Sequence, residues 1–457
     1  MVEFKRGDRI PILDGSEAEV LGDKPLGSGG QGEVYKVLYK GKEYALKWYT
    51  ASSIRDMAKE FSKNIQNNID RGSPGDGFLW PKHLTEIQKE NNGFGYLMDL
   101  IPSNYSSFSD ILRTYKVDVA ADGTGVRVPV GFKSLDTMVL SAHKMVAAFR
   151  SLQRAGLSYQ DLNDGGFYID TVTGDVLICD CDNVAPSGEN FGIKGKPGYM
   201  APEVVTNTKK PDRNTDKHSL SVVLFKLLMR GDPLEGSKVC SCVVLTGSKE
   251  LEFYGTDPLF IYDENDTSNM PVKGIHSNVI KNWPLFPDYV RDTFKTAFGP
   301  GLKNPSSRPI PDDWFKILSR LRMDIVSCVC GRQSFFSTTD DGSDMHTCSR
   351  CGRQHHVMEI GGNPIVLAEG KEIHPGDIDA GNEDYGTVIG RVIENRKVQG
   401  VFGVKNLSNY SWTASYADGT IKEVQSGGGA PITDGMTLKF GTGGNNLIKV
   451  PEGKTRR

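Results

Sequence analysis

A glycine-rich stretch flanked by strand-like sequence on both sides constrains the fold of this chain most. Gly27, Gly29 and Gly32 have G-x-G-x-x-G spacing, and glycines let backbone N–H groups approach phosphate oxygens with no Cβ in the way. A dinucleotide-binding fold requires a helix after the third glycine. Residues 33–39 instead alternate apolar and polar side chains and include β-branched ones, which predicts a strand. A glycine loop between two strands is expected to cover nucleotide phosphates.

The segment after the glycine loop supplies candidate charged groups. Lys47 lies in an apolar strand, residues 44–49, close enough in sequence to the glycine loop to reach the α- and β-phosphates. The spacing of apolar residues predicts a helix over residues 53–68. On this helix, Glu60 is the predicted partner of Lys47, and Asp56 is the alternative.

A further apolar strand, residues 95–102, breaks at Pro102 and suits a hinge between two lobes. Backbone groups at such a hinge would bind adenine. The glycine loop, the strands and the hinge together give the predicted ATP-binding residues. These are Gly27, Gly29, Gly32, Val34, Ala45, Lys47, Met98, Asp99, Leu100 and Ile101.

Carboxylates gather later, around the acidic loop at residues 157–166. Asp161 in this loop and Asp180 with Asp182 stand at the two ends of a predicted hairpin, residues 167–179. Carboxylates brought together at strand ends suit metal–phosphate chemistry, in which one orients a hydroxyl and another holds Mg²⁺. A solvated acidic turn is the alternative for this stretch read alone.

Taken in order, these features resemble a eukaryotic-type protein kinase over about residues 20–322. Asp161 resembles the catalytic-loop aspartate and Asp180 the metal-binding aspartate after the next strand. Residues 195–203 resemble the end of a kinase activation segment, with Ala201-Pro202-Glu203 intact. The resemblance implies a bilobal kinase fold, ATP with Mg²⁺ or Mn²⁺, a protein substrate, and proton acceptance by Asp161.

Two structural contacts also follow from the resemblance. Asp216 begins an apolar helix like the one whose aspartate anchors the catalytic loop of kinases. Arg308 matches the arginine that pairs with the glutamate of the Ala-Pro-Glu triplet, here Glu203.

The catalytic loop departs from the kinase pattern at several positions. Gln160 replaces an arginine, so a switch ordered by activation-loop phosphorylation is not expected. Asn163 replaces the catalytic lysine, and Gly166 replaces the metal-binding asparagine. We expect Asp182 or Asn163 to supply the missing metal ligand beside Asp180.

Lys196 offers a cation that offsets one of these losses, since it follows Gly195 where kinases usually have threonine. We hypothesise that Lys196 and Asn163 have exchanged roles, with Lys196 stabilising the transferring phosphoryl group; the alternative is a solvent-facing lysine. The departures also fit a nucleotide-binding pseudokinase. Retention of Lys47, Glu60 and the two aspartates favours an active enzyme, with Ser/Thr hydroxyls, including its own, as acceptors.

Four later cysteines have the spacing of metal ligands, C-x-C followed by C-x-x-C. They are Cys328, Cys330, Cys348 and Cys351. Four thiolates predict a zinc ribbon with a closed, structural Zn²⁺ site. His355 or His356 is the alternative ligand, and four free thiols are the alternative state.

From about residue 361, short strands alternate with Gly/Asp/Asn turns, which predicts an all-β sandwich. Residues 390–391, 405–408 and 438–441 resemble a forkhead-associated domain, with Arg391 and Ser408 as phosphopeptide ligands. The domain order also resembles bacterial kinases of tellurite- and stress-resistance clusters. That resemblance implies stress signalling with a cognate phosphatase and a von Willebrand A-type partner; a phosphopeptide-reading scaffold is a further alternative.

The predicted architecture is multidomain α+β: kinase N-lobe and hinge (1–102), C-lobe (103–322), zinc ribbon (323–360) and β-sandwich (361–457). Segments 116–133 and 236–282 are predicted to be loop-like insertions. A net charge of −3 gives no support for nucleic-acid binding. No apolar run reaches membrane-spanning length and the N-terminus lacks a secretory signal, so a cytoplasmic protein without membrane contact is expected.

Overall fold

The computed structural model describes residues 4–119, 124–190, 192, 195–336, 345–360, 363–379, 381–398, 400–441 and 447–449. The chain is a mixed α and β protein that divides into two compact units. The first comprises Met1–Lys133, Leu140–Ile280 and Thr293–Trp314, and the second comprises Ser134–Val139, Lys281–Asp292 and Phe315–Arg457. Within the described ranges, no helix is both long and apolar enough to cross a membrane.

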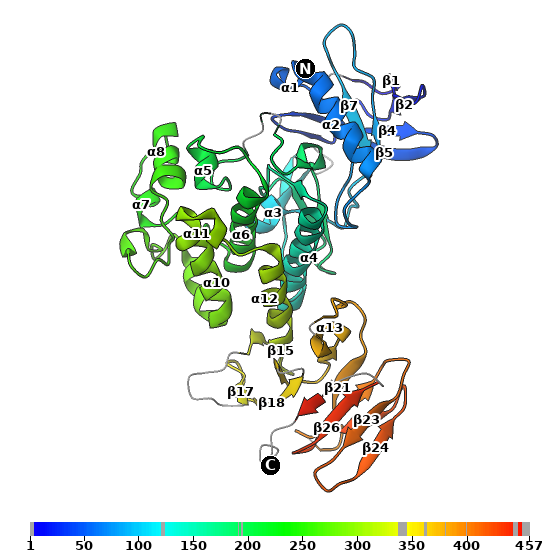
Figure 1. Ribbon diagram of the computed structural model, residues 1–457, viewed down its shortest axis with the longest axis vertical. Helices are drawn as coiled ribbons and strands as arrows, with labels where there is room; N and C mark the ends of the chain where they lie inside the picture. The colour runs from blue at the N-terminus through cyan, green and yellow to red at the C-terminus, as the bar shows by residue number, and fades with distance from the viewer. Residues whose placement is uncertain are drawn as a thin grey trace. The chain divides into compact units, whose positions relative to one another are not determined.

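An antiparallel sheet forms the N-terminal part of the first unit (Figure 1). Its strand order is β1-β2-β4-β5-β7-β6, with β3 paired to β4. The strands are β1 (Arg9–Pro11), β2 (Glu17–Val20), β3 (Gly27–Ser28), β4 (Gly32–Tyr39), β5 (Lys42–Tyr49), β6 (His83–Leu84) and β7 (Gly95–Met98). The predicted glycine loop is therefore the β3–β4 turn, and a strand follows it.

Strand β5 directs its side chains alternately to two apolar clusters. Leu46 and Trp48 pack in a cluster with Tyr35 on one face, whereas Ala45 and Tyr49 pack on the other face. Because side chains alternate along a strand, Lys47 lies on the face of Ala45 and Tyr49.

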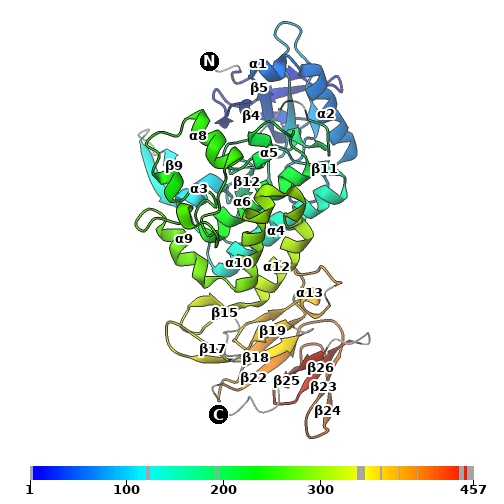
Figure 2. The ribbon, with the colours of Figure 1, turned by 60° about the vertical axis from the view of Figure 1, so that its left-hand side comes forward.

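Helix α2 (Ala58–Arg71) covers this second face, beside the sheet in both ribbon views (Figure 2). It follows the short helix α1 (Ser52–Arg55). Phe61 and Ile65, four residues apart, bury one side of α2 in the cluster that contains Tyr49. A fully buried side chain of this size contributes roughly 1.5–3 kcal/mol.

The segment between residues 103 and 323 is mainly helical. Its helices are α3 (Phe108–Arg113), α4 (Leu135–Arg154), α5 (Pro202–Val205), α6 (Arg213–Met229), α7 (Ser237–Cys240), α8 (Gly247–Leu251), α9 (Ser277–Asn282), α10 (Asp288–Phe298), α11 (Pro300–Lys303) and α12 (Pro311–Met323). Helix α6 is buried on almost all sides, as expected of an apolar helix inside a domain. Asp212 caps it by accepting hydrogen bonds from the Asn214 and Thr215 amides.

Short strands frame the acidic loop. β12 (Phe167–Ile169) pairs antiparallel with β13 (Val176–Ile178), which confirms the predicted hairpin. β8 (Ser106–Ser107) extends this sheet, and β11 (Leu157–Ser158) pairs with β14 (Ala185–Pro186).

Both segments predicted as loop-like contain regular structure. In 116–133, β9 (Tyr115–Val119) and β10 (Gly125–Pro129) form an antiparallel hairpin; residues 120–123 lie outside the described residues. Segment 236–282 contains α7, α8 and α9. The prediction failed because short helices and an exposed hairpin leave little apolar periodicity in the sequence.

The second unit contains the small antiparallel sheet of β15 (Ile325–Ser327) and β16 (Gln333–Phe335) and two larger antiparallel sheets. One has the order β17-β18-β27-β26-β23-β24 with β19 on β18, and the other β20-β21-β22-β25. The strands are β17 (Met345–Thr347), β18 (Gln354–Ile360), β19 (Asn363–Val366), β20 (Glu372–Ile373), β21 (Gly390–Glu394), β22 (Phe402–Asn406), β23 (Trp412–Ser415), β24 (Ile421–Val424), β25 (Gly429–Pro431), β26 (Thr437–Phe440) and β27 (Leu447–Lys449). A helical turn, α13 (Pro375–Ile378), follows β20.

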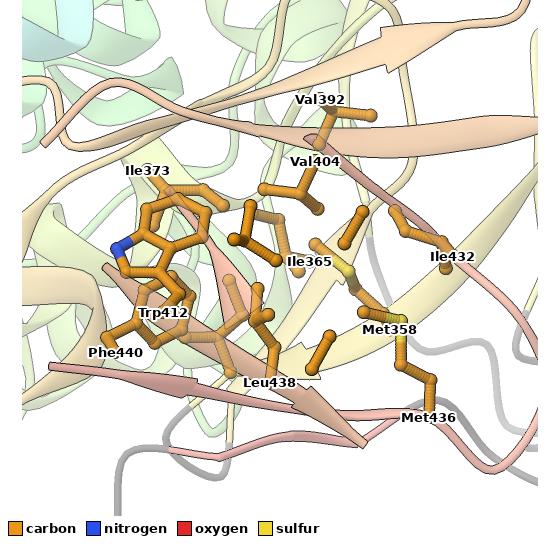
Figure 3. Close-up of a cluster of buried hydrophobic side chains, with 14 of the residues drawn as sticks. Met358, Ile365, Ile373, Val392, Val404, Trp412, Ile432, Met436, Leu438 and Phe440 are labelled. Atoms are coloured by element: carbon orange, nitrogen blue, oxygen red, sulfur yellow. The ribbon is translucent and has the colours of Figure 1, made fainter. Parts of the chain in front are cut away.

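An apolar core lies between these two sheets (Figure 3). Val392 and Val404 from β21 and β22 face Trp412 and Leu438 from β23 and β26. Strand β18 hydrogen-bonds to β17 on one part and to β19 and β27 on another. The sheet is therefore continuous through residue 360, where the ribbon and the sandwich were expected to separate.

Candidate functional site

A cavity of about 810 Å³ opens below the glycine loop in the first unit. This volume suits a nucleotide-sized ligand. All ten predicted ATP-binding residues line it, together with Asp161, Asn163, Asp180 and Lys196. The cavity lining does not include Glu60 or Asp182, the two other predicted active-site residues.

The glycine loop combines one closely packed glycine with two open ones. A Cβ at Gly32 would clash with the Trp48 carbonyl, so the strand pairing requires glycine there. At Gly27 and Gly29, a Cβ would meet nothing within 4 Å. The loop backbone therefore faces open space, as close approach to a phosphate requires.

Backbone polar groups are available at the hinge. Met98 pairs with Ala45 at the end of β7. Leu100 and Ile101, which the structure describes, take part in no backbone–backbone hydrogen bond. Their amide and carbonyl groups can therefore bind the edge of an adenine.

Lys47 is buried in the cavity wall between two carboxylates. Its Nζ donates to Asp180 Oδ1 at 3.0 Å and to both carboxylate oxygens of Asp182 at 3.0 Å. Gln31, from the glycine loop, accepts a further bond at 3.1 Å. Burial alone would lower the pKa of Lys47, but Asp180 and Asp182 outweigh it and raise the pKa above its usual value.

The predicted Lys47–Glu60 pair is not formed in this structure. Glu60 is exposed in the first turn of α2. Asn64, one turn further along the same face, is buried and donates to the Asp182 and Val184 carbonyls. Neutral amides thus occupy the part of α2 that meets the Asp182 segment.

Asp182 is placed differently from a metal ligand. Its side chain has no solvent exposure, and it accepts hydrogen bonds from the Tyr49 and Tyr96 hydroxyls as well as from Lys47. Burial favours the neutral carboxyl, but Lys47 and Tyr49 outweigh this effect and lower the pKa of Asp182. The structure therefore corrects the prediction that Asp182 supplies oxygen to Mg²⁺.

Asp180 keeps the exposure that a metal ligand needs. Its side chain is 44% exposed, and its backbone adopts a left-handed conformation with φ of 52°. Non-glycine residues in this conformation are strained and concentrate at functional sites.

Asp161 and Asn163 are joined at the base of the cavity. Asn163 Nδ2 donates to Asp161 Oδ1 at 2.9 Å, and its Oδ1 accepts from the Gly165 amide at 2.8 Å. Burial, aided by the charge of Asp180, raises the pKa of Asp161 to about 6, although the Asn163 bond opposes this shift. A carboxylate with this pKa can accept a proton near neutral pH.

Tyr159 explains the missing asparagine at position 166. The Tyr159 side chain is fully buried, and its hydroxyl donates to the Cys179 carbonyl. A Cβ at Gly166 would lie 2.8 Å from that hydroxyl. The tyrosine therefore leaves no room for a side chain there.

The contacts expected of the three structural residues are formed. Asp216 accepts hydrogen bonds from the Tyr159 and Gln160 amides at 2.7 and 2.9 Å. Arg308 and Glu203 form a bidentate pair at 2.7 and 2.8 Å, with Arg308 almost fully buried. These contacts fix both ends of the segment between the acidic loop and α6.

Lys196 lines the cavity but binds another carboxylate. Its Nζ pairs with Asp164 Oδ1 at 2.5 Å, and Ser109 also donates to Asp164. Burial would raise the pKa of Asp164, but the Lys196 contact lowers it. Asp164 therefore holds Lys196 near Asp161, a role that no sequence pattern indicates.

A pair of amides connects Gln160 to the segment that follows β14. Gln160 Nε2 donates to the Glu189 carbonyl at 2.5 Å, and Asn190 donates to Gln160 Oε1 at 2.7 Å. Neutral hydrogen bonds therefore form where the kinase pattern has an arginine.

The second unit brings its four predicted metal-ligating cysteines together. The cluster consists of Cys328, Cys330, Cys348 and Cys351, and their sulfur atoms all lie within 4.8 Å of one another. Cys328 and Cys351 are 3.6 Å apart and Cys330 and Cys348 3.7 Å apart. Thiolates 2.3 Å from one tetrahedral Zn²⁺ would be about 3.8 Å apart, so the donor set fits zinc.

The two cysteine-bearing turns have matching backbones. Cys328 and Cys330 follow β15 (Ile325–Ser327), which pairs with β16 (Gln333–Phe335). Gly331 and Gly352, directly after the second cysteine of each pair, both have positive φ. The connection between the two turns includes 337–344, which lie outside the described residues.

The two predicted phosphopeptide ligands have different environments. Ser408 is 6% exposed and accepts a hydrogen bond from the Trp412 indole. Arg391 pairs with Glu372 at 2.7 Å. Burial of Ser408 corrects the ligand prediction for that residue. The Arg391 side chain is 45% exposed and its pair with Glu372 is a surface ion pair, so its role as a phosphate ligand stays a prediction.

Comparisons with known proteins agree with this arrangement for part of the chain. No protein-family model matches. The chain is 26% identical to serine/threonine-protein kinase MPS1 of Encephalitozoon cuniculi over 230 residues, which are 49% of this chain and 35% of that protein. It is 25% identical to dual specificity protein kinase shkB of Dictyostelium discoideum over 230 residues, 48% of this chain and 32% of that protein.

About half of this chain is thus distantly similar to serine/threonine and dual specificity protein kinases. The chain spans about a third or less of the length of the curated relatives it matches.

Proposed function

We propose that this protein is an ATP-dependent protein kinase that transfers the γ-phosphate to serine or threonine hydroxyls. One observation carries the proposal: Lys47, Asp161 and Asp180 meet in a single cavity under an open glycine loop. Phosphoryl transfer requires phosphate binding, charge neutralisation and orientation of a hydroxyl in one place. The distant kinase relatives support the same reaction class.

Asp161 is the proposed proton acceptor. With a pKa raised to about 6, it is ionised at neutral pH and can orient and deprotonate a substrate hydroxyl. Lys47 would bind the α- and β-phosphates from the cavity wall. Lys196, held by Asp164, would stabilise the transferring phosphoryl group with its positive charge, the role of the lysine that Asn163 replaces.

Asp180, with Asn163 beside it, would hold Mg²⁺ or Mn²⁺. Asp180 fits a hard cation because its carboxylate is half exposed at the cavity, and Mg²⁺ in phosphotransfer sites binds one or two carboxylates together with phosphate oxygens. The bound cation supplies charge neutralisation at the phosphates.

Transfer of labelled phosphate from ATP, in the presence of Mg²⁺, tests this function. The comparison is wild type against Asp161→Asn, with Asp118→Asn as the control because Asp118 is exposed on the β9–β10 hairpin. We expect label on a generic protein substrate or on the chain itself with wild type and the control, and loss of roughly 10²-fold or more with Asp161→Asn. Equal labelling by all three proteins, or none by any, would remove the proposal.

A nucleotide-binding pseudokinase is the second candidate. The specific observation in its favour is Gly166, where Tyr159 excludes the metal-binding side chain. Tight nucleotide binding without phosphate transfer would support it.

The second unit is proposed to be a zinc-stabilised, forkhead-associated-like interaction module. The proposed setting is bacterial stress signalling, with a cognate phosphatase and a von Willebrand A-type protein as partners. The cysteine cluster supports the zinc site.

A further inference from the structure

Lys47 has a fully enclosed carboxylate partner that the kinase pattern does not contain. In that pattern, the lysine pairs with a glutamate on the helix after it, and position 182 is a glycine. Here the corresponding helix contributes Asn64 and Asn68, and both donate to backbone carbonyls of the Asp182–Val184 segment. The carboxylate comes instead from Asp182.

Both carboxylate oxygens of Asp182 accept hydrogen bonds from buried side chains. Lys47 contacts both oxygens at 3.0 Å, the Tyr96 hydroxyl donates to Oδ1 at 3.0 Å, and the Tyr49 hydroxyl donates to Oδ2. The side chain is completely buried. A buried carboxylate with this many donors has one orientation and no free oxygen for a metal.

The partners of Asp182 come from rigid elements. Lys47 and Tyr49 lie on the same face of β5, and Tyr96 lies on β7, directly across from Lys47. All three side chains are buried in the sheet. The ammonium group of Lys47 is therefore restrained at the cavity wall by the sheet and by Asp182 together.

We propose that Asp182 is the positioning residue of Lys47, the role for which Glu60 was predicted, and holds its ammonium group toward the nucleotide phosphates. Asp180 thereby remains as the carboxylate for the metal. The proposal deepens the kinase function proposed above and rests on it for its kinetic consequences.

The first test compares Asp182→Asn with Glu60→Gln, which makes the same chemical change at an exposed position. Phosphate transfer is measured as a function of ATP concentration. We expect kcat/KM for ATP to fall between roughly tenfold and a hundredfold for Asp182→Asn, and to stay within about twofold of wild type for Glu60→Gln. Unchanged or increased turnover by Asp182→Asn, or loss with Glu60→Gln alone, would overturn the proposal.

A second readout follows Lys47 itself and requires no activity. A small amine-reactive acylating reagent can reach Lys47 through the cavity that it lines, and peptide mass spectrometry gives the rate. Because Lys47 Nζ donates to both oxygens of Asp182, Asp182→Asn should release this amine toward the cavity and speed acylation of Lys47 several-fold. Lys226, whose side chain is 17% exposed and pairs with Asp232, is the internal control, and its acylation rate should not change.

The acylation measurement separates the two proposals. If wild type transfers no phosphate, the proposed function fails, whereas faster acylation of Lys47 in Asp182→Asn still supports the pairing. If Asp182→Asn does not fold, the double variant Tyr49→Phe/Tyr96→Phe removes two donors and keeps the charge. Because the two hydroxyls no longer fix the orientation of the Asp182 carboxylate, the affinity of this variant for ATP should fall several-fold relative to wild type, and an unchanged affinity would overturn the proposal.

Discussion

Tyr159 and Gly166 should be energetically coupled, because the tyrosine hydroxyl occupies the space of a side chain at position 166. A Cβ there would lie 2.8 Å from the hydroxyl and 3.7 Å from the ring carbon that carries it. The first distance forces a shift, whereas the second is an ordinary contact. Gly166→Ala should therefore displace the hydroxyl from the Cys179 carbonyl and cost about 1–3 kcal/mol in free energy of unfolding, the cost of an unsatisfied buried polar group.

Removing the hydroxyl first should relieve that clash. Tyr159→Phe loses the same hydrogen bond and should cost about 1–3 kcal/mol. In the double variant the bond is lost only once, so the combined cost should fall short of the sum by roughly 1 kcal/mol or more.

Urea denaturation of wild type, the two single variants and the double variant measures this coupling. Gly29→Ala is the control, since a Cβ there meets nothing within 4 Å, and it should combine additively with Tyr159→Phe. Additivity within about 0.5 kcal/mol for the 159/166 pair would refute the explanation given for Gly166.

Three further predictions follow from other contacts. Activity should fall about tenfold per pH unit below pH 6 as Asp161 is protonated, and full activity at pH 5 would contradict its role as base. Because the raised pKa means that the folded chain binds this proton more tightly than the unfolded chain, Asp161 contributes more to the stability of the fold as the pH falls. Purified protein should hold about one zinc ion. Cys351→Ser should lose this zinc and lower the unfolding temperature of the second unit, whereas Cys242→Ser should do neither. Unchanged zinc content in Cys351→Ser would exclude the site. Arg308→Lys should cost about 1–3 kcal/mol because it loses the fork that binds Glu203; calorimetry showing no change would contradict this.

Local sequence patterns predicted those parts of the site that depend on neighbouring residues. The glycine loop, the β12–β13 hairpin and the cysteine spacing each lie within a short stretch whose periodicity or ligand pattern is readable. The Arg308–Glu203 pair spans 105 residues and was predicted only through the kinase resemblance.

The Lys47 partner could not be read in the same way. Helical spacing predicts that Glu60 lies on the same face of α2 as Asn64. It does not indicate whether the first turn of that helix is covered by other residues. Asp182 reaches Tyr49 and Tyr96 across 133 and 86 residues, and nothing in the order of the chain indicates that the three meet. The role of Ser408 was missed for a related reason, because its burial under Trp412 depends on the packing of the sandwich.

The central claim is that the Asp161 cavity transfers phosphate rather than only binding nucleotide. The most direct measurement is ADP affinity together with mass-spectrometric detection of phosphoserine or phosphothreonine, for wild type and Asp161→Asn. In its proposed role, Asp161 would orient the acceptor hydroxyl and not bind the nucleotide base. The account therefore predicts that both proteins bind ADP within about threefold of each other and that only wild type forms phosphorylated product. Equal ADP binding with no product from wild type would contradict the account.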